Sequence, residues 1–94
     1  MLYVGDVRIT QVNIVQIDEG NLVANADITI DDCFRVRDLK IFRRPTGYYI
    51  AMPQAKLKNG RYKEIAFALD AQTRKKIEDM VTAEYEKVAG KRAR

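Results

Sequence analysis

The hydrophobic period of this chain changes once, near Asp70, and that change limits the folds it can adopt. Before Asp70 apolar and polar residues alternate, most clearly from Leu22 to Ile30, as in a strand with one face on a core and the other in water. After Asp70 apolar residues recur at helical spacing, at Ile77, Met80, Val81, Tyr85 and Val88. This order predicts an α+β fold, with an antiparallel sheet of about four to five strands and one C-terminal helix packed on it.

Turn signals divide the region before Asp70 into strands. Glu19-Gly20-Asn21 separates a weaker strand candidate, Val4 to Val12, from the Leu22–Ile30 strand. The two segments therefore predict a first hairpin. Asp31-Asp32 supplies the next turn.

The strand that follows this turn changes phase along its length. Phe34 and Val36 are expected to point inward, whereas farther on Leu39 and Ile41 are the apolar residues. Because side chains alternate strictly along a regular strand, we expect a bulge or a break near Asp38.

Proline and glycine mark the limits of the next strand. Arg44-Pro45-Thr46-Gly47 is typical of a turn, and Tyr48, Ile50 and Met52 then form an apolar face. Pro53 has no N–H to donate to a neighbouring strand, so this strand is predicted at a sheet edge or with a bulge.

Asn59-Gly60 is a strong signal for a two-residue hairpin turn, followed by a strand from Tyr62 to Leu69. A type I′ turn there would pair Lys58 with Arg61, Leu57 with Tyr62 and Lys56 with Lys63. Alternation would then place all four cations on one face of the hairpin.

The C-terminal helix is predicted from Ala71 to Ala89, with Asp70 as its N-cap and Gly90 at its end. The chain is therefore interpreted as one domain, residues 1–90, with a basic C-terminal tail, residues 91–94. Arg74-Lys75-Lys76 lies in the first turns of the helix, where the helix dipole disfavours cations, and this placement hints at a specific use.

Length and composition exclude most catalytic and metal-binding classes. A chain of 94 residues with no histidine and one cysteine has room for one small domain, and it lacks zinc-finger spacing, an intramolecular disulfide and an imidazole catalyst. Cys33 follows two aspartates, which oppose thiolate formation. We expect no enzyme activity, cofactor, metal or small-molecule substrate, in a cytoplasmic protein without a membrane segment.

Charge is distributed unevenly along the chain. Residues 1–34 carry one cation and six anions, residues 35–63 nine cations and one anion, and residues 64–94 seven cations and six anions, which give −5, +8 and +1. A basic middle suits an anionic partner, and it equally suits self-assembly of oppositely charged patches.

The basic hairpin is the strongest candidate for a binding site. A two-stranded ribbon fits the major groove of DNA, and lysine and arginine suit phosphate contacts. The predicted nucleic-acid-binding residues are Lys56, Lys58, Asn59, Arg61 and Lys63, with Arg43 and Arg44 at the neighbouring turn. The competing interpretation is that charge keeps a protruding hairpin soluble and prevents edge pairing.

Several segments together resemble the stage V sporulation protein G (SpoVG) family of bacterial septation regulators. The resemblance covers roughly residues 4–86, and the combination of Asp31-Asp32 with Ala51-Met52-Pro53 is its most specific part. Phe67-Ala68 departs from the usual His-Pro of the family, and Leu57-Lys58 from Thr-Pro. The matching segments are Val4–Arg8, Ala26–Phe34, Val36–Ile41, Gly47–Pro53, Gly60–Ala66 and Thr73-Arg74.

This resemblance implies a small regulator of gene expression, sporulation and cell division or septation. It implies an antiparallel sheet with a C-terminal helix, a homodimer formed through sheet contacts, and binding to DNA and, in some members, RNA. The family's DNA contacts are associated with the segment that here is Gln54 to Gly60. The alternative is a protein-interaction module that acts on division or cell-envelope machinery without binding nucleic acid, through the acidic N-terminal half or the helix.

Overall fold

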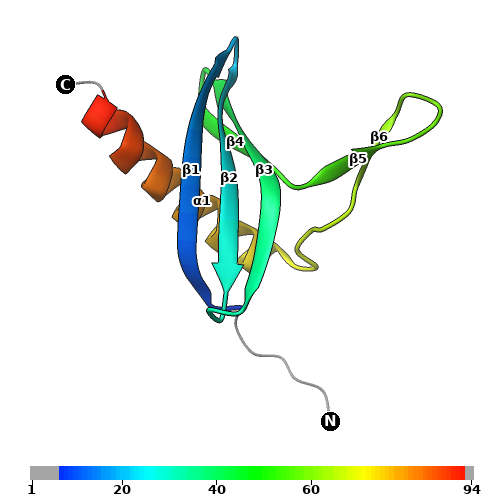
Figure 1. Ribbon diagram of the computed structural model, residues 1–94, viewed down its shortest axis with the longest axis horizontal. Coiled ribbons are helices and arrows are strands. Elements are labelled where there is room, and N and C mark those ends of the chain that lie inside the picture. The colour runs from blue at the N-terminus through cyan, green and yellow to red at the C-terminus, as the bar shows by residue number, and fades with distance from the viewer. Residues whose placement is uncertain (1–6, 93–94) are drawn as a thin grey trace.

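The computed structural model describes residues 7–92, and of Lys91 and Arg92 the backbone alone. It has the predicted α+β architecture: a four-stranded antiparallel sheet in the order β1-β2-β3-β4, a separate two-stranded sheet and one helix. Figure 1 shows the helix crossing one face of the larger sheet, while the smaller sheet projects sideways. The elements are β1 (Ile9–Glu19), β2 (Leu22–Ile30), β3 (Phe34–Arg44), β4 (Gly47–Ala51), β5 (Gln54–Lys56), β6 (Tyr62–Glu64) and α1 (Ala71–Arg92).

The hydrophobic core lies between the four-stranded sheet and α1. The central strands supply fully buried side chains because both of their edges are paired and the helix covers one face. The predicted apolar stripe of the helix faces this core, as expected for a helix that covers a sheet. Among the core residues are Ala24, Ala26, Ile28, Leu39, Ile41, Ile50, Ile77, Val81 and Tyr85.

The pairing of β2 with β3 is irregular at two places. The phase change predicted near Asp38 is confirmed as a bulge, because the β2–β3 register shifts there and Asp38 has φ of 69°. A second shift lies beside Val23, which joins the core. The alternation from Leu22 to Ile30 predicts that the face of β2 with Val23 and Thr29 lies in water, and this is wrong at these two residues, because both side chains are buried.

The turns predicted within the four-stranded sheet are confirmed. Gly20 has φ of 64°, in the left-handed region that glycine tolerates, and it joins β1 to β2. Asp31 and Asp32 adopt positive φ between β2 and β3, as short polar side chains tolerate. Pro45-Thr46 connects β3 to β4, and β4 is an edge strand as Pro53 predicted.

The bounds of the first strand differ from the prediction. β1 starts at Ile9 and continues to Glu19, whereas the alternation indicated Val4 to Val12. Residues 4–6 lie outside the described part of the chain. The short turn at Gly20 lets β1 pair with β2 from Ile9 to Glu19. This pairing extends β1 beyond Val12, where the alternation of apolar and polar residues ends.

Three further predictions are wrong. Phe34 pairs with Ile30 at the end of the sheet and is 62% exposed instead of inward. The strand predicted from Tyr62 to Leu69 stops at Glu64, because its partner ends where the chain turns at Pro53. The helix continues through Gly90 to Arg92. A glycine inside a helix costs only about 1 kcal/mol and does not force an end.

Candidate nucleic-acid interface

The hairpin predicted to bind nucleic acid forms a separate arm, residues 54–64. It begins directly after β4 and Pro53, and Figure 1 shows it extending away from the sheet and helix. No arm residue belongs to the buried core cluster of the described residues. The arm is therefore held by its own strand pairing and its connections to the body, which we define as the four-stranded sheet with α1.

The loop of the arm contains three residues, one more than the sequence predicted. The N–H of Gly60 donates to the carbonyl of Leu57 at 3.0 Å, and the N–H of Leu57 donates to the carbonyl of Arg61 at 2.7 Å. Gly60 has φ of 88°, the left-handed conformation typical of a turn closed by a glycine bulge. The side-chain oxygen of Asn59 accepts from the N–H of Arg61 at 2.9 Å, so Asn59 stabilises this turn.

This loop changes the predicted register of the arm by one residue. Lys56 lies opposite Tyr62, and Ala55 lies opposite Lys63. The prediction that all four cations share one face is therefore wrong: alternation places Lys56 on one face and Lys63 on the other, with Lys58 in the loop. The assumption of a two-residue type I′ turn gave the wrong loop length, because Asn-Gly also suits a three-residue loop.

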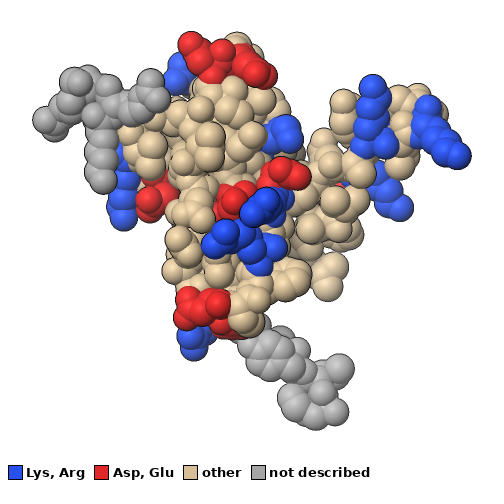
Figure 2. Space-filling model, viewed as in Figure 1, with Lys and Arg blue, Asp and Glu red and all other residues tan. Residues whose placement is uncertain are grey.

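The cations of the arm have no acidic partners in the part of the chain that the structure describes. The ion pairs among residues 7–90 all lie outside the arm, and Glu64 is its one acidic residue. Figure 2 shows lysine and arginine side chains on several sides of the arm, with uncharged surface between them. The arm therefore presents a positive surface from more than one direction.

Arg43 and Arg44 are not brought together with the arm. They are the last two residues of β3, beside the turn that leads into β4, whereas the arm follows the far end of β4. The guanidinium of Arg44 stacks 4.4 Å from the ring centroid of Tyr49, and Arg43 lines a shallow hollow of about 350 Å³ beside Tyr85. Both side chains are exposed, but they form a second basic position and not an extension of the first.

Each of the three cations at the start of the helix contacts a carboxylate or a backbone carbonyl of the protein. Arg74 donates from Nη2 to the carbonyl of Ile50 at 2.8 Å and from Nε to Glu78 at 2.8 Å. The hydrogen bond to Glu78 raises the pKa of Arg74. The contact with Ile50 binds the outer edge of β4, a function that the sequence pattern could not identify.

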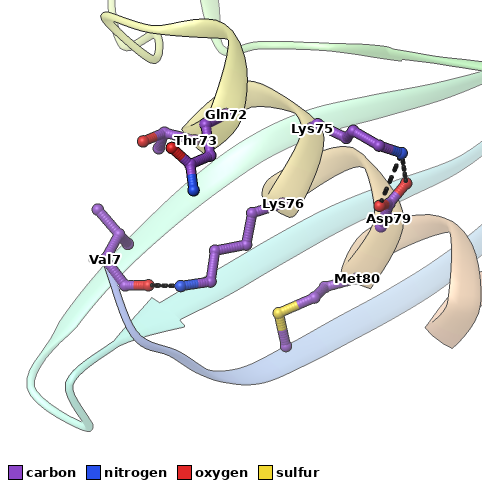
Figure 3. A pocket seen from close by; sticks show the side chains of 7 residues that line it. All are labelled: Val7, Gln72, Thr73, Lys75, Lys76, Asp79 and Met80. Atoms are coloured by element: carbon purple, nitrogen blue, oxygen red, sulfur yellow. Dashed lines mark hydrogen bonds and ion pairs between the residues drawn. The ribbon is translucent and has the colours of Figure 1, made fainter.

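The neighbouring lysines are also occupied. Lys75 pairs with Asp79 at 3.1 Å, and Nζ of Lys76 donates to the carbonyl of Val7 at 2.6 Å. Figure 3 shows both contacts at the rim of a hollow of about 510 Å³. Arg74 and Lys76 thus attach the helix to the chain around it, whereas the pair of Lys75 with Asp79 is an exposed contact within the helix.

The described residues include no cluster of three or more side chains that could ligate a metal. Cys33 is exposed, and its thiol forms no disulfide bond. None of the helices in that part of the chain is long and apolar enough to cross a membrane.

Comparison with known proteins gives a consistent result. The model of the SpoVG family matches residues 6–87. A protein of Anaeromyxobacter sp. (strain Fw109-5) is 44% identical over 80 residues, covering 85% of this chain and 82% of the relative. One of Myxococcus xanthus is 45% identical, covering 85% and 81%, and one of Alkaliphilus oremlandii is 40% identical, covering 94% and 90%. All three carry the name "Putative septation protein SpoVG".

Proposed function

The chain belongs to the SpoVG family, and from that premise we propose that it is a dimeric, non-enzymatic regulator that binds nucleic acid. The arm makes the contact, through Lys56, Lys58, Arg61 and Lys63. In this proposal Asn59 holds the loop, and Arg43 and Arg44 assist from their separate position. The regulator acts on gene expression and on cell division or septation.

The observation that carries the proposal is the position of unpaired positive charge. In the body the helix cations are bound to carboxylates and carbonyls, whereas the arm cations have no such contacts among the described residues. Clustered lysine and arginine that folding does not use are typical of a phosphate-binding surface. Cations on both faces can reach phosphates on both sides of the arm.

The two edges of the large sheet support a dimer through sheet contacts. The outer edge of β4 is bound by the guanidinium of Arg74 at the Ile50 carbonyl. β1, at the opposite edge, has no charged residue and no proline from Ile9 to Ile17. Edge strands of monomers usually carry such residues, which oppose pairing with another chain. We therefore assign the dimer contact to β1, and its partner is a second copy.

Reversal of two arm charges tests the binding proposal. The variant Lys58→Glu with Arg61→Glu is expected to lose binding to duplex DNA and single-stranded RNA in mobility-shift titrations, with an unchanged far-UV spectrum. The matched control, Lys75→Glu with Lys87→Glu, changes the net charge equally on the body and should keep most of the affinity. Equal losses in both variants would mean that overall charge, and not the arm, controls binding.

A second candidate, a protein-interaction module acting on division or cell-envelope machinery, has one observation in its favour. After the arm, Ala66, Phe67 and Ala68 line an apolar hollow, while Ile65 and Leu69 are exposed, Leu69 by 91%. Exposed apolar side chains in sequence mark interaction surfaces. Pull-down of a division protein that survives the arm charge reversals but is lost in Ile65→Ser with Leu69→Ser would favour this function.

A further inference from the structure

Tyr62 is an aromatic side chain that the fold does not use. It is 64% exposed on β6, and it has no aromatic or cationic stacking partner among the described residues. The tyrosines of the body differ, because Tyr48 packs on Tyr85 at 5.2 Å and Tyr49 lies against Phe42 and Arg44. An aromatic ring left open on a projecting arm is available to a ligand.

The register of the arm places a cation on the same face as this ring. Lys56 lies directly across from Tyr62, whereas Arg61 and Lys63, its neighbours in the chain, belong to the other face of the arm. A hairpin with the predicted register would have paired Tyr62 with Leu57 and separated it from the cationic face. The three-residue loop therefore brings Lys56 onto the face that carries Tyr62.

We propose that the arm binds unpaired nucleic acid, with the ring of Tyr62 stacked on a base and Lys56, on the same face, bound to a flanking phosphate. This inference rests on the proposed function and names its ligand class. Proteins that bind single strands without strong sequence preference combine aromatic stacking positions with a basic track. The arm provides both on eleven consecutive residues, 54–64.

The tyrosine ring is expected to favour single strands over duplexes. In a duplex each base is stacked between its neighbours, so a tyrosine reaches a base face only by intercalation. In a single strand the faces are open, and a tyrosine stacks on any base. Tyr62 therefore adds affinity for unpaired nucleic acid, whereas the cations alone bind the phosphates of either form.

Binding to three labelled oligonucleotides tests this assignment, using fluorescence anisotropy and the full chain. The probes are oligo(dT), an abasic oligonucleotide of the same length and charge, and a duplex. Tyr62→Ala should lower affinity for oligo(dT) about ten-fold, with the slope of log affinity against log salt unchanged. Affinities for the abasic and duplex probes should change by less than about two-fold, because the phosphate contacts remain.

Two variants control for shape and exposure. Tyr62→Phe keeps the ring and should bind oligo(dT) like the unaltered protein. Leu57→Ala removes the exposed apolar side chain of the opposite face, which has no π-system, and should have little effect. Loss of affinity in Tyr62→Ala that is equal for all three probes, or no loss for any of them, overturns the stacking assignment.

Failure of this inference can be distinguished from failure of the proposed function. If the arm binds phosphates but does not stack, Lys58→Glu with Arg61→Glu abolishes binding to every probe while Tyr62→Ala changes none. If the unaltered protein binds none of the probes, both the proposed function and the stacking assignment are wrong.

Discussion

The body and the arm use the same residue types for different purposes. In the first turns of α1, arginine and lysine bind carboxylates and backbone carbonyls, and they fix the helix to β4 and to the chain near Val7. In the arm, lysine and arginine have no acidic partner within residues 7–90. A cation that folding uses is therefore no evidence for a binding site, and the arm cations lack such a use.

The apolar residues show the same contrast. The body buries its large side chains between sheet and helix, whereas Leu57 and Tyr62 on the arm remain largely exposed. Burial stabilises the body, and deletion of a buried side chain lowers the free energy of unfolding by the lost burial of its atoms and the cost of the cavity left behind. The arm contributes little to the core, so substitutions there should change binding and not folding.

The largest expected difference between the two regions is in stability. Leu39→Ala removes a fully buried side chain from β3 and should lower the free energy of unfolding by about 2–5 kcal/mol. Lys58→Ala, on the exposed loop of the arm, should change it by less than about 0.5 kcal/mol. Urea denaturation followed by circular dichroism measures both, and comparable losses would contradict the division into body and arm.

A smaller effect on stability is expected at Arg74. Comparing Arg74 with Lys75 distinguishes a cation that contacts the sheet from one that lies on the surface. Arg74→Ala removes the hydrogen bonds to Ile50 and Glu78 and should cost about 1 kcal/mol, because the side chain is partly exposed. Lys75→Ala loses only a surface ion pair with Asp79 and should cost about 0.3 kcal/mol. Equal costs in urea denaturation would show that the contact with β4 contributes nothing.

The smallest predicted effect depends on pH. The N–H of Thr73 donates to the carboxylate of Asp70 at 2.6 Å, and this bond lowers the pKa of Asp70. A lowered folded-state pKa adds stability above the ordinary aspartate range, and that stability is lost as the pH falls through the folded pKa.

Asp70→Ala should therefore reduce the melting temperature at pH 7, and the difference from the unaltered protein should shrink as the pH falls below the ordinary pKa of aspartate. Asp70→Asn, a neutral residue that also caps helices, gives the control because its effect should depend less on pH. A deficit in Asp70→Ala that is constant across this range would mean that the carboxylate is not the stabilising group.

Much of the body could be predicted from the sequence, because local patterns determine it. Alternation identified β2, Asp70 marked the helix start, and the phase change identified the bulge at Asp38. The limits of β1 could not be predicted, since they depend on pairing with β2. The end of the helix could not either, because Gly90 permits a stop without requiring one.

The arm could be located but not described in detail. Charge counting identified residues 35–63 as basic, and Asn59-Gly60 identified the turn of a basic hairpin from Lys56 to Lys63. The dipeptide is compatible with both a two-residue and a three-residue loop, and that one-residue difference decides which side chains share a face. The position of Lys56 directly across from Tyr62 was therefore visible only in the structure.

The central claim is that the arm is a phosphate-binding surface whose cations folding leaves free, and its salt dependence tests this most directly. For a dimer with about four phosphate contacts per subunit, log affinity for duplex DNA should fall against log salt with a slope near −7. Lys58→Ala with Arg61→Ala, which removes two of the four contacts per subunit without adding negative charge, should reduce the slope to about half. A slope near zero in the unaltered protein, or the same steep slope in both proteins, would contradict the account.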